Sequence, residues 1–385
     1  MGRGSAPGPR VAFIYHFLPD YREAVFRELL NDPSIEAEFV AGAVGPGFEG
    51  VPLASGIPCR EVRNLWLGPV LWQRGVASLA WRREHDVLVF RGSWLTLSTW
   101  VGAAIGRLRG KAVHFWLIGW RRRESGLRRW LRPRYLRLAH RLLLYGERAK
   151  ALGVEHGYPE ARMHVVGNSL PYEPTEPSLI EEPQGSLSVL WVTRLLPYKK
   201  PALLIEAIHL AHRRGVALDC TFVGPGDASE LIEQVEALGL SDHVRFVGRM
   251  DAEALRPLFA RARVVAIPAH AGLTVAHALI SGVPVVVNDD AGANPPEWDY
   301  VVPLDAATHA TTHATTGEGR EPNGSHFRSG DAQSLSDELL RWCVERPAST
   351  SERRRIAREA ARTVSPRRSA EAIVAAIRCS MIARR

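Results

Sequence analysis

The sequence predicts an α/β protein built from two doubly wound domains. Three observations support this prediction. Short apolar runs typical of buried strands alternate with amphipathic helical patterns in both halves of the chain. A proline-rich, acidic and aperiodic segment lies between the halves, over 171–186. The length of 385 residues exceeds what one hydrophobic core usually supports.

The elements follow in order along each half. We expect a first domain over 1–172, a linker over 173–186, a second domain over 187–350 and a C-terminal helix over 351–385. In the first half the expected strands are 11–15, 35–41, 87–91, 112–117, 141–145 and 163–166, and the expected helices are 21–30, 95–108 and 127–136. In the second half the expected strands are 187–192, 219–223, 244–247, 264–267 and 283–287, and each is followed by a helical pattern.

Composition limits the possible settings. Four scattered cysteines without short paired spacing argue against a zinc site or a disulfide framework, and we expect a reducing cytoplasm. The first ten residues lack an apolar signal core, and no apolar run is long enough to span a bilayer. The tandem Ala-Thr-His repeat over 307–316 reads as a polar surface loop.

The net charge of +8 is concentrated in one part of the first half. Between Arg107 and Lys150 there are fourteen basic residues and two acidic ones, with Trp116, Trp120 and Trp130 among them. Such a segment fits nucleic-acid binding, a membrane-surface patch or the solvated face of arginine-rich helices. No nucleic-acid recognition motif accompanies the charge, so we expect no nucleic-acid partner.

A cationic turn after the strand at 187–192 is the strongest functional signal. Arg194 and Lys199 stand between that strand and a helical pattern that begins near Pro201. Arginine offers a planar donor fork, lysine a mobile charge, and a helix N-terminus free N–H groups, so the layout suits a phosphate or diphosphate. Solvated turn residues are the alternative for this segment taken alone.

Three further loops follow strands in the second half. Gly224 and Gly226 allow a tight turn next to a helix, and the strand end at 244–250 presents backbone groups near Arg249 and Met250 that suit a base edge. The third loop places Gly272, Leu273 and Thr274 at a helix start, where a phosphate or sugar oxygen can bind. His277 falls one turn into that helix, as a ligand or as a core histidine.

Taken together, these motifs resemble family 4 glycosyltransferases, which have the GT-B fold. The chain carries R-L-x-P-x-K at 194–199, V-G-x-G at 223–226, F-x-G at 246–248 and G-L-x-x-x-x-A at 272–278. In the first half, 16–26 and 144–149 resemble the loop and helix after the first strand and the segment before the domain boundary. The resemblance covers about residues 10–345 and implies two Rossmann-like domains facing an interdomain cleft.

The chain departs from the family pattern at two places. Most members have two carboxylates eight positions apart around the helix start, where this chain has Ala269 and His277. The chain resembles a branch of surface-polysaccharide enzymes with His at the second position and a later Pro-Glu, which implies a ribose or sugar contact for Glu297; a solvated loop carboxylate is the alternative. Relatives often have His where Ile118 stands, so His16 is expected to carry the polar role in the first domain.

The resemblance implies a retaining glycosyltransferase that needs no metal and no cofactor. A nucleotide-diphosphate sugar would bind the second domain and a hydroxyl acceptor the first. Separately, the basic segment over 121–141 is expected to make peripheral contact with an anionic membrane, with Trp120 or Trp130 at headgroup level, and the acceptor would then be lipid-linked; an arginine-rich solvated helix is the alternative. Arg194 and Lys199 would stabilise the leaving diphosphate. The alternatives are a nucleotide-sugar 2-epimerase and a degenerate, non-catalytic sugar-binding protein of the same fold.

Overall fold

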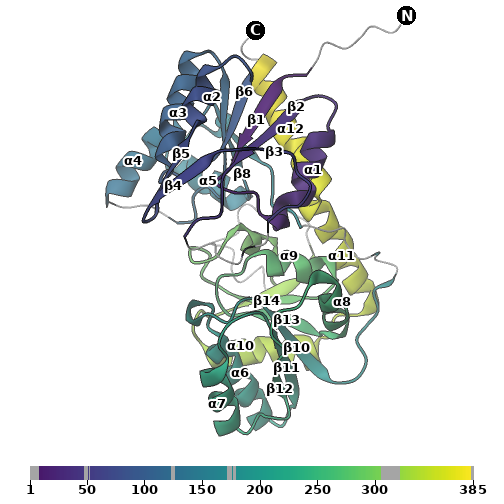
Figure 1. Cartoon of the computed structure of the whole chain (residues 1–385). Coiled ribbons are helices and arrows are strands. Elements are labelled where there is room, and N and C mark those ends of the chain that lie inside the picture. The colour runs from purple at the N-terminus through teal and green to yellow at the C-terminus, as the bar shows by residue number, and fades with distance from the viewer. Residues whose placement is uncertain are drawn as a thin grey trace, which may run out of the picture. The chain divides into compact units, whose positions relative to one another are not determined.

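The chain forms two compact units in a computed structural model (Figure 1). Unit 1 consists of Met1–Tyr172 and Val364–Arg385, and unit 2 of Glu173–Thr363. The structure describes residues 8–46, 51, 53–122, 126–170, 176, 179–304 and 321–382, without the side chains of 127–129 and 252. The repeat over 307–316, expected as a surface loop, lies outside the described residues.

Unit 1 is built on a seven-stranded parallel sheet with the strand order β3-β2-β1-β6-β7-β8-β9. Its strands are β1 (Arg10–Ile14), β2 (Glu36–Ala41), β3 (Cys59–Glu61), β6 (Val87–Arg91), β7 (Ala112–Leu117), β8 (Arg141–Leu144) and β9 (Met163–Val165). Its helices before the linker are η1 (Asp20–Arg22), α1 (Glu23–Asn31), α2 (Val76–Trp81), α3 (Leu97–Leu108), α4 (Gly126–Leu136), α5 (Glu147–Glu155) and η2 (Glu160–Arg162).

Both faces of this sheet are covered, as the continuous apolar strands require. Val11 and Phe13 of β1 belong to one core, and Ala12 and Ile14 belong to the core on the opposite face. The first core includes α1, and the second includes α2 and α3. The predicted strands over 87–91 and 112–117 are confirmed residue for residue.

A hairpin inserted between β3 and α2 was not expected from the sequence. It consists of β4 (Arg63–Leu67) and β5 (Val70–Arg74), which pair antiparallel as a separate two-stranded sheet. Exposure, and not polarity, alternates along both strands, so each strand has one face directed inward and one directed outward.

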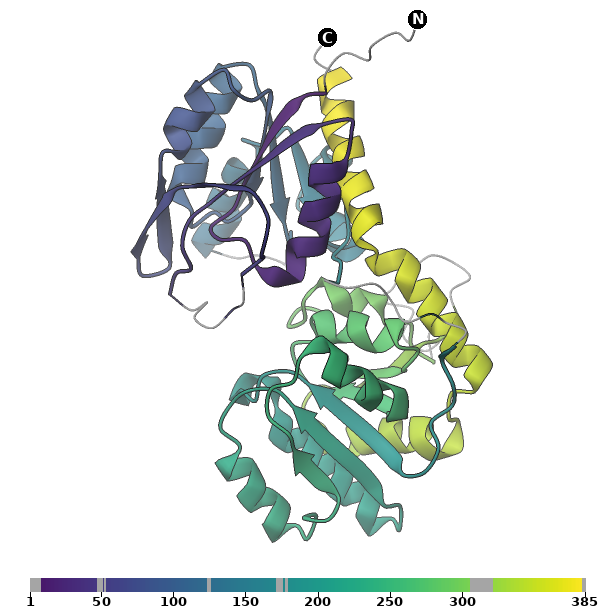
Figure 2. The same cartoon turned by 45° about the vertical axis from the view of Figure 1, so that its right-hand side comes forward.

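The expectation of a single C-terminal helix over 351–385 is corrected by the structure. The structure has two helices, α11 (Thr350–Val364) and α12 (Pro366–Ile382). Proline at 366 lacks an N–H group and disfavours helical backbone at the residue before it, so the helix is interrupted there. Ile373 and Ile377 of α12 then enter the α1 core of unit 1, and Figure 2 shows α12 in yellow beside the purple α1.

Unit 2 has a six-stranded parallel sheet with the order β12-β11-β10-β13-β14-β15, the doubly wound arrangement 3-2-1-4-5-6. Its strands are β10 (Leu187–Val192), β11 (Leu218–Val223), β12 (Val244–Phe246), β13 (Val264–Ile267), β14 (Val285–Asn288) and β15 (Gly324–Phe327). Its remaining elements are η4 (Pro197–Lys199), α6 (Pro201–Arg213), α7 (Ser229–Ala237), α8 (Ala252–Arg261), α9 (Leu273–Ile280), η5 (Pro296–Tyr300), α10 (Ala332–Leu340) and η6 (Arg341–Glu345).

The predicted α/β class is therefore confirmed in both units. Strands 187–192 and 264–267 were predicted at their observed bounds, whereas β15 and α10 were not predicted. Among the described helices, no stretch combines the length and apolar character that crossing a bilayer needs. Ligand sites in parallel sheets lie at the carboxyl ends of the strands.

Candidate functional site

The predicted cationic turn leaves the carboxyl end of β10 in unit 2. The backbone N–H of Thr193 still bonds the carbonyl of Val223 at 3.0 Å, and Arg194 follows as an exposed side chain. Among the described residues, no acidic side chain pairs with Arg194. The chain then forms η4, and Lys200 turns it into α6 with a left-handed φ of 56°.

Lys199 is buried, with 8% of its surface exposed. Its Nζ donates to the carbonyl oxygen of His270 at 2.8 Å and lies 3.3 Å from His270 Nδ1. Burial, together with the nearby Arg194 charge, lowers the pKa of Lys199 to about 8, although the Glu297 charge acts in the opposite direction. The structure therefore brings the predicted residues Arg194, Lys199 and Glu297 within electrostatic range of one another.

His270 has a backbone conformation that is unusual for a residue with a side chain. Its φ is 55°, in the left-handed region, where His is one of the few non-glycine residues found with some frequency. Its ring packs edge-on against Tyr198 with centroids 5.6 Å apart. Such strain persists only where surrounding contacts enforce it, and it concentrates at binding sites.

A buried asparagine pair enforces this loop. Asn294 Oδ1 accepts the backbone N–H of Ala271 at 2.7 Å, and its Nδ2 donates to Asn288 Oδ1 at 3.0 Å. Asn288 Nδ2 donates in turn to the carbonyl of Pro268 at 2.9 Å. The Trp298 indole N–H closes the network on the Asn288 carbonyl at 2.7 Å. The 288–298 segment therefore fixes the backbone just before α9.

The start of α9 meets the end of β10. Thr274 Oγ1 donates to the carbonyl of Val192 at 2.6 Å, so this hydroxyl anchors the helix to the strand. The predicted residues Gly272, Leu273 and Thr274 thus lie next to the cationic turn, with the first-turn N–H groups of an eight-residue helix. Burial lowers the pKa of His277 to about 4, so this ring is neutral at pH 7.

Glu297 lies in η5 and is 3% exposed. The alternative interpretation of this residue as a solvated loop carboxylate is therefore wrong. Its charge acts on Lys199, so this buried carboxylate lies within electrostatic range of the cationic turn.

The two predicted glycines are required by close packing of loops. A Cβ at Gly224 would lie 1.9 Å from the Thr193 carbonyl oxygen, and a Cβ at Gly226 would lie 2.7 Å from that of Leu195. Both also have positive φ, 149° and 142°. The Gly224 N–H bonds the Gly248 carbonyl at 2.8 Å, so the segment with Arg249 and Met250 lies beside the same loop.

His16 belongs to unit 1 and follows the carboxyl end of β1. It is buried, and desolvation together with the Arg91 charge lowers its pKa to about 2, so the ring is neutral. Its carbonyl accepts from Asn64 Nδ2 at 2.7 Å, and Gln73 Nε2 donates to the Tyr15 carbonyl at 2.9 Å. The β4–β5 hairpin therefore fixes the loop that carries His16.

The same edge of unit 1 contains a buried arginine between aromatic rings. Arg22 is 5% exposed, and its guanidinium carbon lies 4.8 Å from the Trp116 ring centroid and 4.7 Å from that of Tyr145. Trp116 lies near the carboxyl end of β7 and Tyr145 follows β8, so the carboxyl ends of two strands meet η1 at this point.

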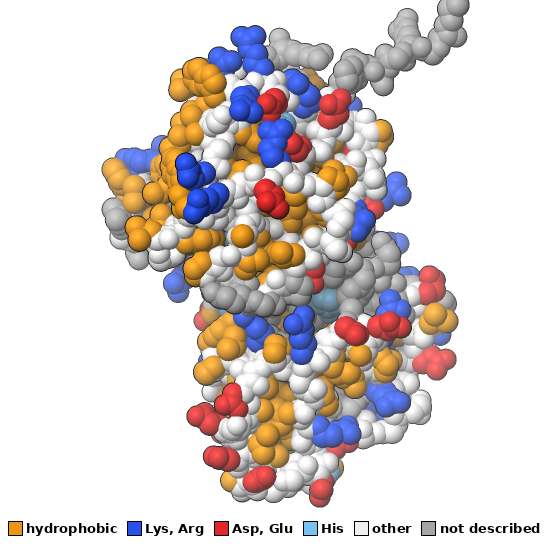
Figure 3. All heavy atoms as spheres, viewed as in Figure 1, with side chains coloured by type: hydrophobic (Ala, Val, Ile, Leu, Met, Phe, Trp, Pro, Cys, Tyr) orange, Lys and Arg blue, Asp and Glu red, His pale blue; other side chains and the backbone are white. Residues whose placement is uncertain are grey.

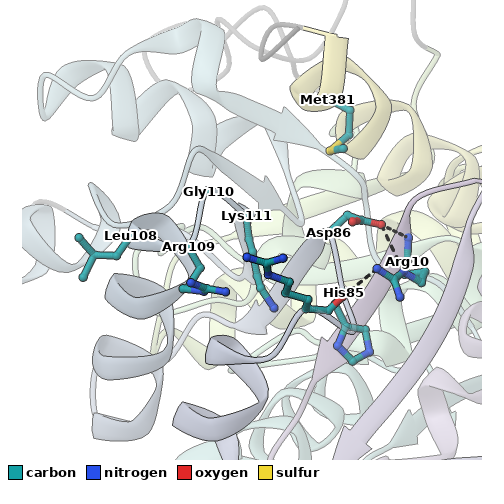
Figure 4. A pocket seen from close by; sticks show the side chains of 9 residues that line it. Arg10, His85, Asp86, Leu108, Arg109, Gly110, Lys111 and Met381 are labelled. Atoms are coloured by element: carbon teal, nitrogen blue, oxygen red, sulfur yellow. Dashed lines mark hydrogen bonds and ion pairs between the residues drawn. The ribbon is translucent and has the colours of Figure 1, made fainter.

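A hollow of about 750 Å³ lies at the opposite, amino edge of the unit 1 sheet (Figure 4). Its charged groups are used within the protein. Arg10 pairs with Asp86, and Lys111 Nζ donates to the carbonyls of Leu79 and Arg82 at the end of α2. His85 Nε2 lies 2.6 Å from Glu38 Oε2. These contacts are structural, and the hollow is distinct from the carboxyl-edge site.

Sequence reasoning missed His270, Asn288 and Asn294. Left-handed backbone at a histidine and a hydrogen bond between asparagines six residues apart depend on tertiary contacts. The Asn-rich run before Pro295 was the one available signal, because asparagine side chains often bond backbone groups in loops.

Comparison with known proteins gives matches in this part of the chain. Residues 174–298, which contain Arg194, Lys199, Gly272 and Glu297, match the family model described as glycosyl transferases group 1. The chain is 33% identical over 135 residues to a D-inositol 3-phosphate glycosyltransferase of Salinispora tropica, and 32% identical over 138 residues to that of Nocardia farcinica. These matches cover 32% and 33% of this chain and span only 28% and 31% of the relatives' length.

Solved structures resemble the chain over nearly its whole length. Anabaena HepE in complex with UDP aligns with a TM-score of 0.69 at 17% identity, covering 96% of this chain and all of that one. Sucrose-phosphate synthase of Thermosynechococcus elongatus aligns with 0.65 at 16% identity, covering 97% and 100%. The lipopolysaccharide outer core galactosyltransferase WaaB aligns with 0.66 at 14%, covering 96% and 99%. The protein therefore has the GT-B fold, and its residues 174–298 match the group 1 glycosyltransferases.

Proposed function

We propose that the protein is a retaining, metal-independent glycosyltransferase that moves a sugar from a nucleotide-diphosphate donor to an acceptor hydroxyl. The observation that carries this proposal is the buried Lys199 bonded to the strained His270 loop, next to Arg194 and the start of α9. All of these groups lie within the segment that matches the glycosyl transferases group 1. We place the protein in family 4, in the branch with His at position 277.

The chemistry follows from where charge develops. As the bond between the anomeric carbon and the diphosphate oxygen breaks, negative charge grows on the diphosphate. Arg194, Lys199 and the first N–H groups of α9 would stabilise that charge, in place of a metal ion. The acceptor oxygen bonds the anomeric carbon from the same face, and its proton passes to the departing diphosphate oxygen. The neutral His277 ring and the Glu297 side chain suit contacts with sugar or ribose hydroxyls.

Two other functions share this fold. A putative UDP-N-acetylglucosamine 2-epimerase of Listeria monocytogenes aligns with a TM-score of 0.61, so the fold alone does not separate epimerase from transferase. The group 1 match over 174–298 favours the transferase. A non-catalytic sugar-binding role is disfavoured because the chain has the Arg194 and Lys199 pair that would stabilise a leaving diphosphate.

For the acceptor we propose a lipid-linked hydroxyl compound of a polysaccharide or glycolipid pathway in the cytoplasm, bound by unit 1 near His16. The basic segment 121–141 was expected to reach a membrane through Trp120 or Trp130. The expectation is wrong for Trp120, which follows a core strand, is 2% exposed and packs against His156 and Tyr158. Trp130 is 54% exposed.

The direct test is incubation with a panel of nucleotide sugars, with release of free nucleotide measured with and without candidate acceptors. Acceptor-dependent release that EDTA leaves unchanged supports the proposal, and the anomeric configuration of the product by NMR tests retention. Epimerised donor without acceptor would indicate the epimerase. Donor binding without turnover of any kind would indicate a sugar-binding protein.

A further inference from the structure

The β4–β5 hairpin of unit 1 has one face directed into the protein. Gln73 and Leu71 of β5 are buried on this face. The Gln73 N–H donates to Ser98 Oγ at 3.1 Å, which holds the hairpin on the first turn of α3. Because side chains alternate along a strand, the residues between them are fixed on the outer face.

The outer face is apolar where a solvated hairpin face is usually polar. The register pairs Leu65 with Trp72 and Leu67 with Val70. Leu67 is 81% exposed, Leu65 40% and Trp72 37%. Leu97 and Val101, one turn apart on α3, are exposed as well. Figure 3 shows hydrophobic side chains gathered along this side of unit 1, and a contiguous exposed patch of this kind marks an interaction surface.

The same face has positive charge without acidic partners. Arg63 lies directly opposite Arg74, and like charges in this cross-strand position are destabilising. Within the described part of the chain, neither side chain has an ion pair. Between Val62 and Arg123 the sequence has eleven Lys and Arg against two acids. Glu84 pairs with Arg60 and Arg82, and Asp86 pairs with Arg10, so these acids do not pair with the hairpin arginines. The charge therefore calls for an anionic partner.

We propose that this hairpin face (Arg63, Leu65, Leu67, Val70, Trp72 and Arg74) docks on an anionic bilayer surface. Leu67, beside the turn, would enter the acyl boundary, Trp72 would lie at headgroup level, and the two arginines would contact lipid phosphates. A protruding apolar tip with cations set back along both strands matches the depth profile of a bilayer better than the flat patch of a protein interface. The inference does not depend on the proposed sugar transfer.

Vesicle sedimentation at low salt tests the docking, with phosphatidylcholine vesicles that contain or lack phosphatidylglycerol. We expect binding to the anionic vesicles alone. Arg63→Gln with Arg74→Gln should weaken it about 25-fold, from roughly fivefold for each arginine near an anionic surface. Leu67→Ser with Trp72→Ser should abolish it, and both positions are exposed enough to change without unfolding.

Two matched variants serve as controls. Ile232→Ser with Val247→Ser removes similarly exposed apolar groups from unit 2, at 42% and 44% exposure, and should bind as the wild type does. Arg121→Gln with Arg122→Gln removes charge from the basic segment and should reduce binding less than the hairpin variants.

Three results would overturn the proposal. The wild type could remain in the supernatant with anionic vesicles, or the folded hairpin variants could sediment like the wild type. The third is self-association of the wild type in analytical ultracentrifugation that the hairpin variants lose, without vesicle binding. That result would assign the face to a second copy of the chain instead.

Discussion

The carboxyl edges of the two sheets both contain a buried cation, but they surround it differently. In unit 1, Arg22 is enclosed between the Trp116 and Tyr145 rings, a setting that fixes the guanidinium in place. In unit 2, Lys199 bonds the carbonyl of His270, whose backbone is strained, and lies beside the imidazole of the same residue. From this difference we infer that Lys199, and not Arg22, is the cation that can exchange its protein partner for a ligand.

The largest expected effect comes from removing the charges of the unit 2 edge. Arg194→Ala and Lys199→Ala should each lose a charge-assisted contact of about 1.5–3 kcal/mol in the transition state, or about 10- to 150-fold in kcat/KM. Steady-state kinetics with the identified donor measures this loss. Lys200→Asn is the matched control, because Lys200 is exposed and asparagine accepts its left-handed backbone. Unchanged rates in both alanine variants would remove the assignment.

The pH profile of the wild type is expected to follow Lys199. Its pKa of about 8 means that the ammonium is present below pH 8 and is lost above it, so kcat/KM should fall about tenfold per pH unit on the alkaline side. Lys199→Arg should move this fall to higher pH. Unfolding does not explain the fall: the pKa is below the ordinary value of 10.5, so this group's contribution to stability rises with pH above 8. A flat profile to pH 10 would contradict the assignment.

A pair of substitutions separates the backbone strain at His270 from the role of its ring. Both His270→Gly and His270→Ala remove the imidazole beside Lys199 and should lower kcat/KM alike. Only the glycine relieves the left-handed backbone, so its free energy of unfolding should exceed that of the alanine variant by about 1 kcal/mol. Denaturant titration measures the difference. Equal stabilities would show that the loop relaxes out of the left-handed region.

The smallest effect is expected in unit 1. Arg22→Lys keeps the charge but not the planar stacking, and should lower the free energy of unfolding by about 0.5–1 kcal/mol while the KM for the donor stays unchanged. Arg137→Lys, at an exposed position, is the control and should change neither quantity. A several-fold rise in the donor KM of the Arg22 variant would contradict the contrast between the two cations.

The parallel sheets could be predicted because their strands are buried on both faces and read as continuous apolar runs. Strand β13, for example, could be predicted from that local pattern alone. The hairpin was missed because both of its faces are mixed: the outer face has leucines with Arg63 and Arg74, and the inner face has Leu71 with Gln73, so no period-two pattern appears. Its inward side chains Asn64 and Gln73 bond backbone carbonyls of the loop after β1, a contact that the local sequence does not reveal.

The anion turn was readable for a similar reason: Arg194 and Lys199 stand between a strand and a helix along one continuous stretch of chain. The network that shapes the site joins residues far apart in sequence. Lys199 meets His270 across 71 positions, and Ala271 meets Asn294 across 23. No local pattern specifies such pairs, and the burial of Glu297 and of Trp120 depends on packing in the same way.

The return of α12 to unit 1 affects how the protein is made. Unit 2 is one continuous stretch of chain, whereas the core of unit 1 needs Ile373 and Ile377 from beyond unit 2. The whole of unit 2 is therefore synthesised before α12 can complete the core that contains α1 and β1. Unit 2 can complete its own core first during synthesis, and the N-terminal segment must stay unaggregated until the last helix arrives.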